Sequence, residues 1–265
     1  PLKTIEAVAN PNVDYRYTSC SSDFSKIPGS PIAYWASEDF LKTFTLKKIR
    51  DVASPCIGMR TGDNARFLRL WFEITKTSLG LGLKSAEEAL NSKKKWFPYN
   101  KGGTFRKWYG NNDYVVNWEN DGMEIKMDTR KKYPYLKDNL GWKISNEKYY
   151  FLPSLTWTFT SSSYFGIRYS QHGFLFDVTG SCLFSGEDVI YYLLGFLASV
   201  VSSEILKVLN PTLSFQVVDI ASLPIKISGK YMPQTDGLVQ QNIVISKTDW
   251  DSFETSWDFK CHPFL

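Results

Sequence analysis

The chain has 265 residues, of which 43% are hydrophobic, 22% charged and 16% aromatic. This balance is typical of a folded protein and excludes a disordered chain, and the length suits one large domain or two small ones. The net charge of +4 is unevenly spread, because residues 84–109 hold seven basic and two acidic side chains and a second basic cluster follows at 130–137. Such density indicates either a polyanion partner or a solvated, lysine-rich surface.

The cysteines and histidines give no sign of a metal site. Four cysteines lie far apart without a Cys-x-x-Cys pair, and there are only two histidines. We therefore expect neither zinc nor a disulfide framework, and a reduced, cytoplasmic protein. The longest apolar run, 189–201, is too short for a membrane span, and no signal peptide is visible, so we expect no membrane partner. Because the chain starts at Pro1 and ends at "CHPFL", we interpret it as a fragment of a longer protein.

The first residues predict a linker followed by a capped helix. Residues 1–36 are rich in turn-forming residues, and we interpret them as a linker from an upstream domain that docks through Tyr34 and Trp35. Ser37 is a candidate N-cap for a short helix, "EDFLKTF", with two acids in its first turn.

Two strands and a helix are predicted next. Residues 46–74 predict a strand, a polar turn and a second strand, and the turn contains Gly62, Asp63 and Asn64, which tolerate left-handed backbone. A short helix is expected at 84–92.

The remainder predicts a mixed α+β fold that is rich in strands. Short strand-like segments separated by glycine and polar breaks fill 94–180, and a long helix near 186–209 ends at Pro211. A return to strand is expected at 213–227, and a turn-rich tail from about 230. The long helix should be buried, since its apolar residues recur every three or four positions: Tyr191, Leu194, Leu197, Ala198, Val201, Ile205 and Leu209.

We find no catalytic motif in the chain. A Walker loop, Gly-x-Ser-x-Gly, His-Glu-x-x-His and Gly-x-Gly-x-x-Gly are all absent. The "SKKK" at 92–95 matches Ser-x-x-Lys only within a lysine run. No catalytic residue, metal ligand or cofactor-binding residue is therefore predicted, which favours a binding module.

Four stretches, read in order, resemble one family. They are "KIPGSPIAYWASEDFLKTF" (26–44), "GMRTGDNARFLRLWFEI" (58–74), "KKWFPYNKGGTFRKWYGNNDYVVNWENDGMEIK" (94–126) and "LLGFLASVVSSEILKVLNPTLSFQVVDIASLPI" (193–225). Together they resemble PglX-type proteins, the large adenine-specific DNA methyltransferases of BREX phage-defence systems, which are relatives of fused restriction-modification methylases.

The resemblance implies a role in DNA recognition and not in methyl transfer. Members of the family use S-adenosylmethionine and hold the flipped adenine with an Asn-Pro-Pro-Tyr motif. This chain has only Asn10-Pro11-Asn12 and Asn210-Pro211-Thr212. The methyl-transfer site of an N6-adenine-specific enzyme would thus lie outside it.

The order of the motifs implies a position downstream of the methylase. The expected organisation is a linker at 1–36, a target-recognition domain at 37–229 and the start of a C-terminal segment at 230–265. The partners implied are double-stranded DNA, the upstream methylase domain of the same chain and other subunits of the defence system.

Candidate DNA-binding residues are polar or basic side chains in expected loops. Lys and Arg neutralise phosphates, while Arg, Asn and Gln read base edges. The candidates are Arg60, Thr61, Asp63, Asn64, Arg66, Lys101, Arg106, Lys107, Asn111, Asn112, Arg168 and Tyr169, with Ser161–Ser163 beside the last two.

Competing interpretations remain for these residues. Asp63 and Asn64 can instead cap their own turn, and the aromatics Trp96, Phe97, Trp108 and Trp118 favour a core position. The competing function is a protein-interaction scaffold that docks the methylase to other subunits.

Overall fold

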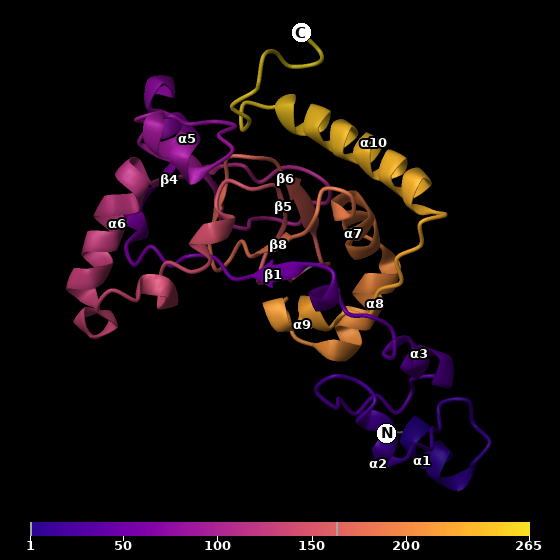
Figure 1. Ribbon diagram of the computed structural model, residues 1–265. Helices are drawn as coiled ribbons and strands as arrows, with labels where there is room; N and C mark the ends of the chain where they lie inside the picture. Colours follow the sequence, from indigo (N-terminus) through magenta and orange to yellow (C-terminus); the bar gives the residue numbers. More distant parts are fainter. Residues whose placement is uncertain (1, 163) are drawn as a thin grey trace.

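The computed structural model describes residues 2–162 and 164–265 and shows a mixed α+β fold, as predicted (Figure 1). Its strands form two four-stranded sheets. The first, in spatial order, is β1 (Ser54–Cys56), β8 (Cys182–Phe184), β5 (Ser154–Trp157) and β6 (Ile167–Ser170), with antiparallel neighbours throughout. The second is β2 (Leu68–Leu70), β4 (Tyr114–Asn117), β3 (Trp96–Asn100) and β7 (Leu175–Phe176), and only its β3–β7 pair is parallel.

Helices and single turns of 3₁₀ helix surround the sheets. The helices are α1 (Leu2–Ala9), α2 (Ser21–Phe24), α3 (Glu38–Thr43), α4 (Asn64–Phe67), α5 (Ala86–Asn91), α6 (Glu119–Lys132), α7 (Ile190–Leu197), α8 (Val200–Leu209), α9 (Val217–Ser222) and α10 (Met232–Asp251). The 3₁₀ turns are η1 (Ile49–Asp51), η2 (Trp71–Glu73), η3 (Lys76–Ser78), η4 (Pro134–Leu136), η5 (Leu140–Trp142) and η6 (Glu147–Tyr149). The predicted cap of α3 is confirmed, since the Ser37 hydroxyl accepts the backbone N–H of Phe40 at 3.2 Å. The helix predicted at 84–92 is α5, which Ser85 caps in the same way.

The helix predicted near 186–209 is two helices, α7 and α8, that meet at 68°. The physical reason is Ser199, whose hydroxyl accepts the N–H of Ser202 at 3.3 Å and so starts a new helix. Leu197 is fully buried, as the apolar stripe predicts, but the bend leaves Val201 61% exposed.

The predicted strand at 213–227 is wrong in its centre, which is α9. Its β-branched residues suggested a strand, but the carboxylate of Asp219 accepts the N–H of Gln216 at 3.1 Å and caps a helix, and Ile220 then fills the core. The predicted turn-rich tail is also wrong, because it contains α10, the longest helix among the described residues. Figure 1 shows α10 lying along α7, where a Cβ on Gly195 would come within 3.0 Å of the Val239 side chain.

The N-terminal residues reach the core by side chains other than those predicted. Ile27 and Ala33 are buried in the same apolar cluster as α7 and β5. Tyr34 and Trp35 remain exposed and pack edge to face on one another. The prediction that the linker docks through this aromatic pair is therefore wrong.

The basic-aromatic stretch at 94–122 is mainly scaffold. It forms β3, a loop at 101–113 and β4, and every residue of β3 is buried. Trp96, Phe97 and Trp118 are buried, as predicted, while Trp108 is half-buried.

Within the described residues, no single helix is both long and apolar enough to cross a bilayer. The bent pair α7–α8 meets that criterion only when its two helices are counted together.

Candidate nucleic-acid interface

The loop from Arg60 to Asn64 is held in place by its own side chains and by a distant segment. The N–H of Arg60 donates to the carbonyl of Lys143 at 2.7 Å. The Thr61 hydroxyl, which is buried, donates to the Asn64 amide oxygen at 2.6 Å. Asp63 caps α4 by accepting the N–H of Arg66 at 3.1 Å. The capping interpretation of Asp63 is thus correct, and hydrogen bonds hold the loop at both ends.

This loop borders a hollow of about 310 Å³. Five of the predicted residues line it: Arg60, Thr61, Asp63, Asn64 and Lys101. Of these, Arg60 and Asn64 are exposed. The side-chain amide of Asn64 accepts from Thr61 through its oxygen. Its N–H groups therefore remain as donors toward solvent.

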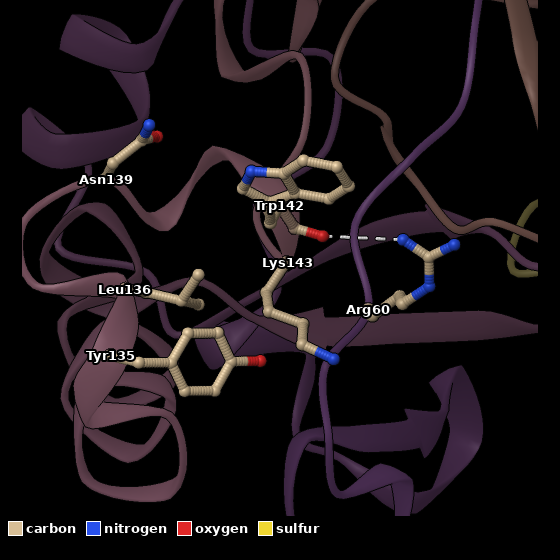
Figure 2. Close-up of a pocket in the computed structure, with 6 residues that line it drawn as sticks. All are labelled: Arg60, Tyr135, Leu136, Asn139, Trp142 and Lys143. Atoms are coloured by element: carbon tan, nitrogen blue, oxygen red, sulfur yellow. Dashed lines mark hydrogen bonds between the residues drawn. The ribbon is translucent and has the colours of Figure 1, made fainter.

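A second and larger hollow of about 570 Å³ shares Arg60 with the first (Figure 2). Tyr135, Leu136, Asn139, Trp142 and Lys143, all on or beside η4 and η5, line its other sides. Tyr135 and Trp142 are each 74% exposed. The Arg60 guanidinium reaches the Trp142 carbonyl only at 3.4 Å, which leaves most of its donors available.

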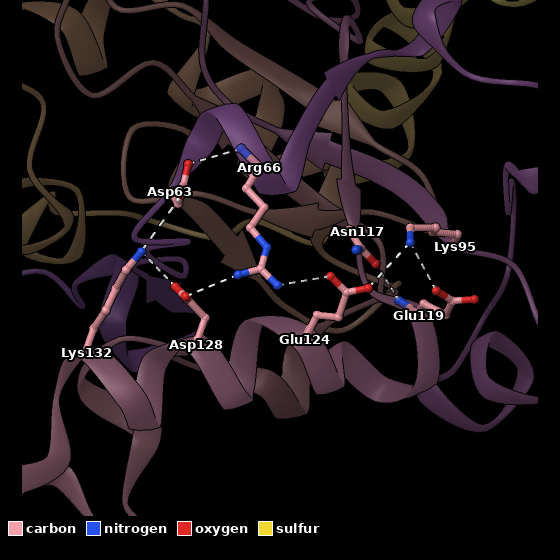
Figure 3. Close-up of polar contacts among 8 residues, drawn as sticks. All are labelled: Asp63, Arg66, Lys95, Asn117, Glu119, Glu124, Asp128 and Lys132. Atoms are coloured by element: carbon pink, nitrogen blue, oxygen red, sulfur yellow. Dashed lines mark hydrogen bonds and ion pairs between the residues drawn. The ribbon is translucent and has the colours of Figure 1, made fainter.

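A network of ion pairs joins α4 to α6 beside these hollows (Figure 3). Arg66 lies 3.6 Å from Glu124 and 3.4 Å from Asp128, and Lys132 lies 2.8 Å from Asp128 and 4.0 Å from Asp63. Surface pairs contribute little singly, but a network of them orients the two helices. Arg66 is consequently directed at α6 and not into either hollow.

Lys101 is engaged inside the protein. Its ammonium lies 2.7 Å from the carboxylate of Asp177, which also accepts hydrogen bonds from Tyr99 at 2.9 Å and from the backbone and hydroxyl of Thr179 at 2.8 and 2.7 Å. Burial, and next the nearby Asp177 charge, hold the pKa of Tyr99 well above its usual value. Tyr99 therefore remains a neutral donor, and Lys101 supplies the positive charge for Asp177.

The two other basic candidates of the 101–113 loop, Arg106 and Lys107, also have partners within the chain. Arg106 lies 3.6 Å from Asp249 and stacks at 4.8 Å on the ring of Trp250. Lys107 donates to the carbonyl of Ala198 at 2.7 Å, at the C-terminal end of α7. A cation there interacts favourably with the negative end of the helix dipole. These contacts fasten the loop to α10 and α7.

Asn111 and Asn112 are buried in the same loop. The Asn111 amide donates to the carbonyl of Thr104 at 2.8 Å, and its φ of +61° is in the left-handed region that asparagine tolerates. Asn111 therefore shapes the loop in this conformation.

Arg168 and Tyr169, on β6, lie apart from the two hollows. Arg168 is buried, its Nε and Nη1 have no hydrogen-bond partner among residues 2–162 and 164–265, and burial lowers its pKa to about 10. Tyr169 lines a separate hollow of about 760 Å³ and packs on Tyr191, with ring centroids 5.7 Å apart. Burial raises the Tyr169 pKa. Among their predicted neighbours, Ser163 lies outside the described residues.

Sequence reasoning did not select the aromatic half of the second hollow. Tyr135 belongs to the basic cluster noted at 130–137, and Trp142 and Lys143 follow shortly after it. The available signal was a pair of aromatics close to basic residues in a region without helical or strand periodicity. No local pattern showed that this segment lies against the loop at Arg60.

We find no metal site in the part of the chain that the structure describes. No three His, Cys, Asp or Glu side chains converge there in a way that would hold an ion.

Comparison with known proteins supplies the family context. No protein-family model matches the chain. Over 264 residues, 98% of its length, it is 40% identical to "Adenine-specific methyltransferase PglX" of Lacticaseibacillus casei (strain Zhang). Over 92% of its length it is 36% identical to "Adenine-specific methyltransferase BrxX" of Escherichia coli O9:H4 (strain HS). The chain spans 21% and 19% of these relatives. The resemblance predicted from the sequence is thus confirmed: nearly the whole chain is similar to one segment of PglX- and BrxX-type adenine-specific methyltransferases.

Proposed function

We propose that this chain binds duplex DNA and reads its sequence for an N6-adenine-specific DNA methyltransferase of a phage-defence system. The observation that carries the proposal is the convergence of two distant segments, the 60–64 loop and residues 135–143, around the exposed Arg60. An enzyme that modifies one adenine in a duplex must hold the DNA and choose its site. A surface that exposes basic and amide groups with donors still available suits that task.

Individual roles follow from the donors that remain available. Arg60 and Lys143 present cations at the rim of the larger hollow and would contact phosphates. Asn64 presents amide N–H groups, which can donate to the acceptors on a base edge in the major groove. Arg66, Lys101, Arg106 and Lys107 support this surface through their ion pairs and hydrogen bonds within the chain.

The methyl-transfer site does not fit the residues of this chain. An adenine-binding Asn-Pro-Pro-Tyr motif needs a free asparagine amide. The amide of Asn210 instead donates to Asp219 at 2.6 Å, and its oxygen accepts from Thr212 at 3.0 Å. We therefore assign the binding of S-adenosylmethionine and the methyl-transfer step to the remainder of a PglX-type protein.

The test is duplex binding by the purified chain. In fluorescence polarisation, labelled duplexes should bind in a salt-dependent way, and a cognate duplex should bind more tightly than a scrambled one. Asn64→Ala should reduce that discrimination by about 1–3 kcal/mol, since one base contact is lost. Salt-independent binding, or none, would contradict the proposal.

A second candidate, a docking scaffold, is favoured by one feature of α10. Leu238, Val244 and Ile245 are exposed apolar side chains on a helix whose buried side packs on α7. If the scaffold were the main function, Ile245→Ser would break assembly with the methylase part. The chain alone would then show no salt-dependent duplex binding.

A further inference from the structure

We propose that the larger hollow beside Arg60 accepts one unstacked nucleotide of the bound DNA. The inference rests on the proposed function, and it adds a ligand class for the hollow: an extruded base with its phosphate.

The size and the rings of the hollow suit a base. Its volume of about 570 Å³ is within the range of small-ligand sites, roughly 300–1,000 Å³. Tyr135 and Trp142 stand at its sides and are each 74% exposed, although tryptophan is highly buried on average. An exposed aromatic face stacks on a nucleobase of any sequence, but only if that base has left the duplex stack.

The segment that carries the two rings is anchored to the rest of the protein. Tyr135 is on η4 and Trp142 on η5, and Leu140 and Ile144 anchor the same segment in the core. The hydrogen bond from the Arg60 N–H to the Lys143 carbonyl fixes the segment to the 60–64 loop. Little ordering of the backbone is therefore required when a ligand enters.

The polar groups of the hollow favour a nucleotide over an aromatic ligand that carries no phosphate. Arg60 and Lys143 bring positive charge, and no carboxylate is among the described residues that line the hollow. This charge favours a ligand that carries a phosphate. The oxygen of the Asn139 amide accepts the N–H of Gly141 at 3.3 Å, so its two N–H groups remain to donate to a base.

The position of the hollow favours DNA over a free nucleotide as the source. It shares Arg60 with the hollow formed by the 60–64 loop, so a strand that contacts Asn64 would pass its opening. A nucleotide displaced from that strand could enter without leaving the surface.

The experiment compares two duplexes that differ by one extrahelical 2-aminopurine nucleotide. By fluorescence polarisation, the wild-type chain should bind the bulged duplex about tenfold more tightly than the perfect one, the scale expected for one stacked base. The 2-aminopurine fluorescence should fall on binding. Trp142→Ala should abolish both the preference and the quenching, whereas Trp35→Ala, a change at an exposed tryptophan outside the hollow, should keep both.

The outcomes separate the two proposals. Equal affinity for the two duplexes, or a preference that survives in Trp142→Ala, would overturn the nucleotide site and leave duplex binding intact. Trp142-dependent binding of dAMP without any preference for the bulged duplex would overturn DNA as the source. Failure to bind either duplex would overturn the proposed function, and this inference with it.

Discussion

Replacing Lys101 with alanine should destabilise the protein, because the lysine compensates a nearly buried carboxylate. The side chains of Lys101 and Asp177 are 21% and 6% exposed, and they lie 2.7 Å apart. Removing one partner of a fully buried pair costs about 3–5 kcal/mol. Here Asp177 keeps three hydrogen-bond donors and Lys101 is partly solvated, so we expect a loss of about 2 kcal/mol in the free energy of unfolding.

Urea unfolding of four proteins measures this effect: the wild type, Lys101→Ala, Asp177→Asn and the double variant. The double-mutant cycle should give a coupling energy of about 1 kcal/mol or more. Lys84→Ala, which removes an exposed lysine, should change stability by less than about 0.5 kcal/mol. If Lys101→Ala were as stable as Lys84→Ala but bound DNA with a lower salt slope, Lys101 would be a phosphate contact, and the reasoning from Asp177 would be refuted.

Three further predictions concern buried groups. Leu197→Ala should lower the free energy of unfolding by about 2–5 kcal/mol, whereas Val201→Ala, on the exposed side of the bend, should change it little; equal effects would show that α8 is packed differently. Arg168→Met should raise stability by about 1–3 kcal/mol, since it removes two buried nitrogens that have no hydrogen-bond partner among the described residues, and a loss would mean that they have a partner. Iodoacetamide at pH 8 should modify two thiols, Cys20 and Cys261, and reach Cys56 and Cys182 only after unfolding, because burial raises the pKa of both to about 11; four fast thiols would contradict this.

The helices with local signals were predictable, and those formed by packing were not. Ser37 and the acids after it mark α3, and Ser85 marks α5, because a cap is encoded within four residues. By contrast, α10 buries only Val239 and Trp250 among its twenty residues, so no apolar period shows in its sequence. The β-branched residues of α9 predict a strand, and tertiary packing reverses that preference.

One half of the candidate surface, the 60–64 loop, could be predicted from the sequence. The polar turn at 60–64 carries its own signature of glycine, aspartate and asparagine. Its contact with Trp142 and Lys143 joins residues about eighty positions apart, which no local pattern encodes. The partners of the basic stretch could not be predicted for a similar reason. Asp177, Asp249 and the Ala198 carbonyl are all remote in sequence from the lysines and the arginine that they contact.

The most direct test of DNA recognition around Arg60 is the salt dependence of duplex binding in two charge-matched variants. Arg60→Ala/Lys143→Ala removes two cations from the proposed interface, and Lys47→Ala/Arg50→Ala removes two exposed cations that line neither hollow at Arg60. Each lost phosphate contact should reduce the slope of log affinity against log salt by about 0.9. The account predicts a reduction of roughly 1–2 for the first variant and almost none for the second. Equal slopes in both variants would contradict it.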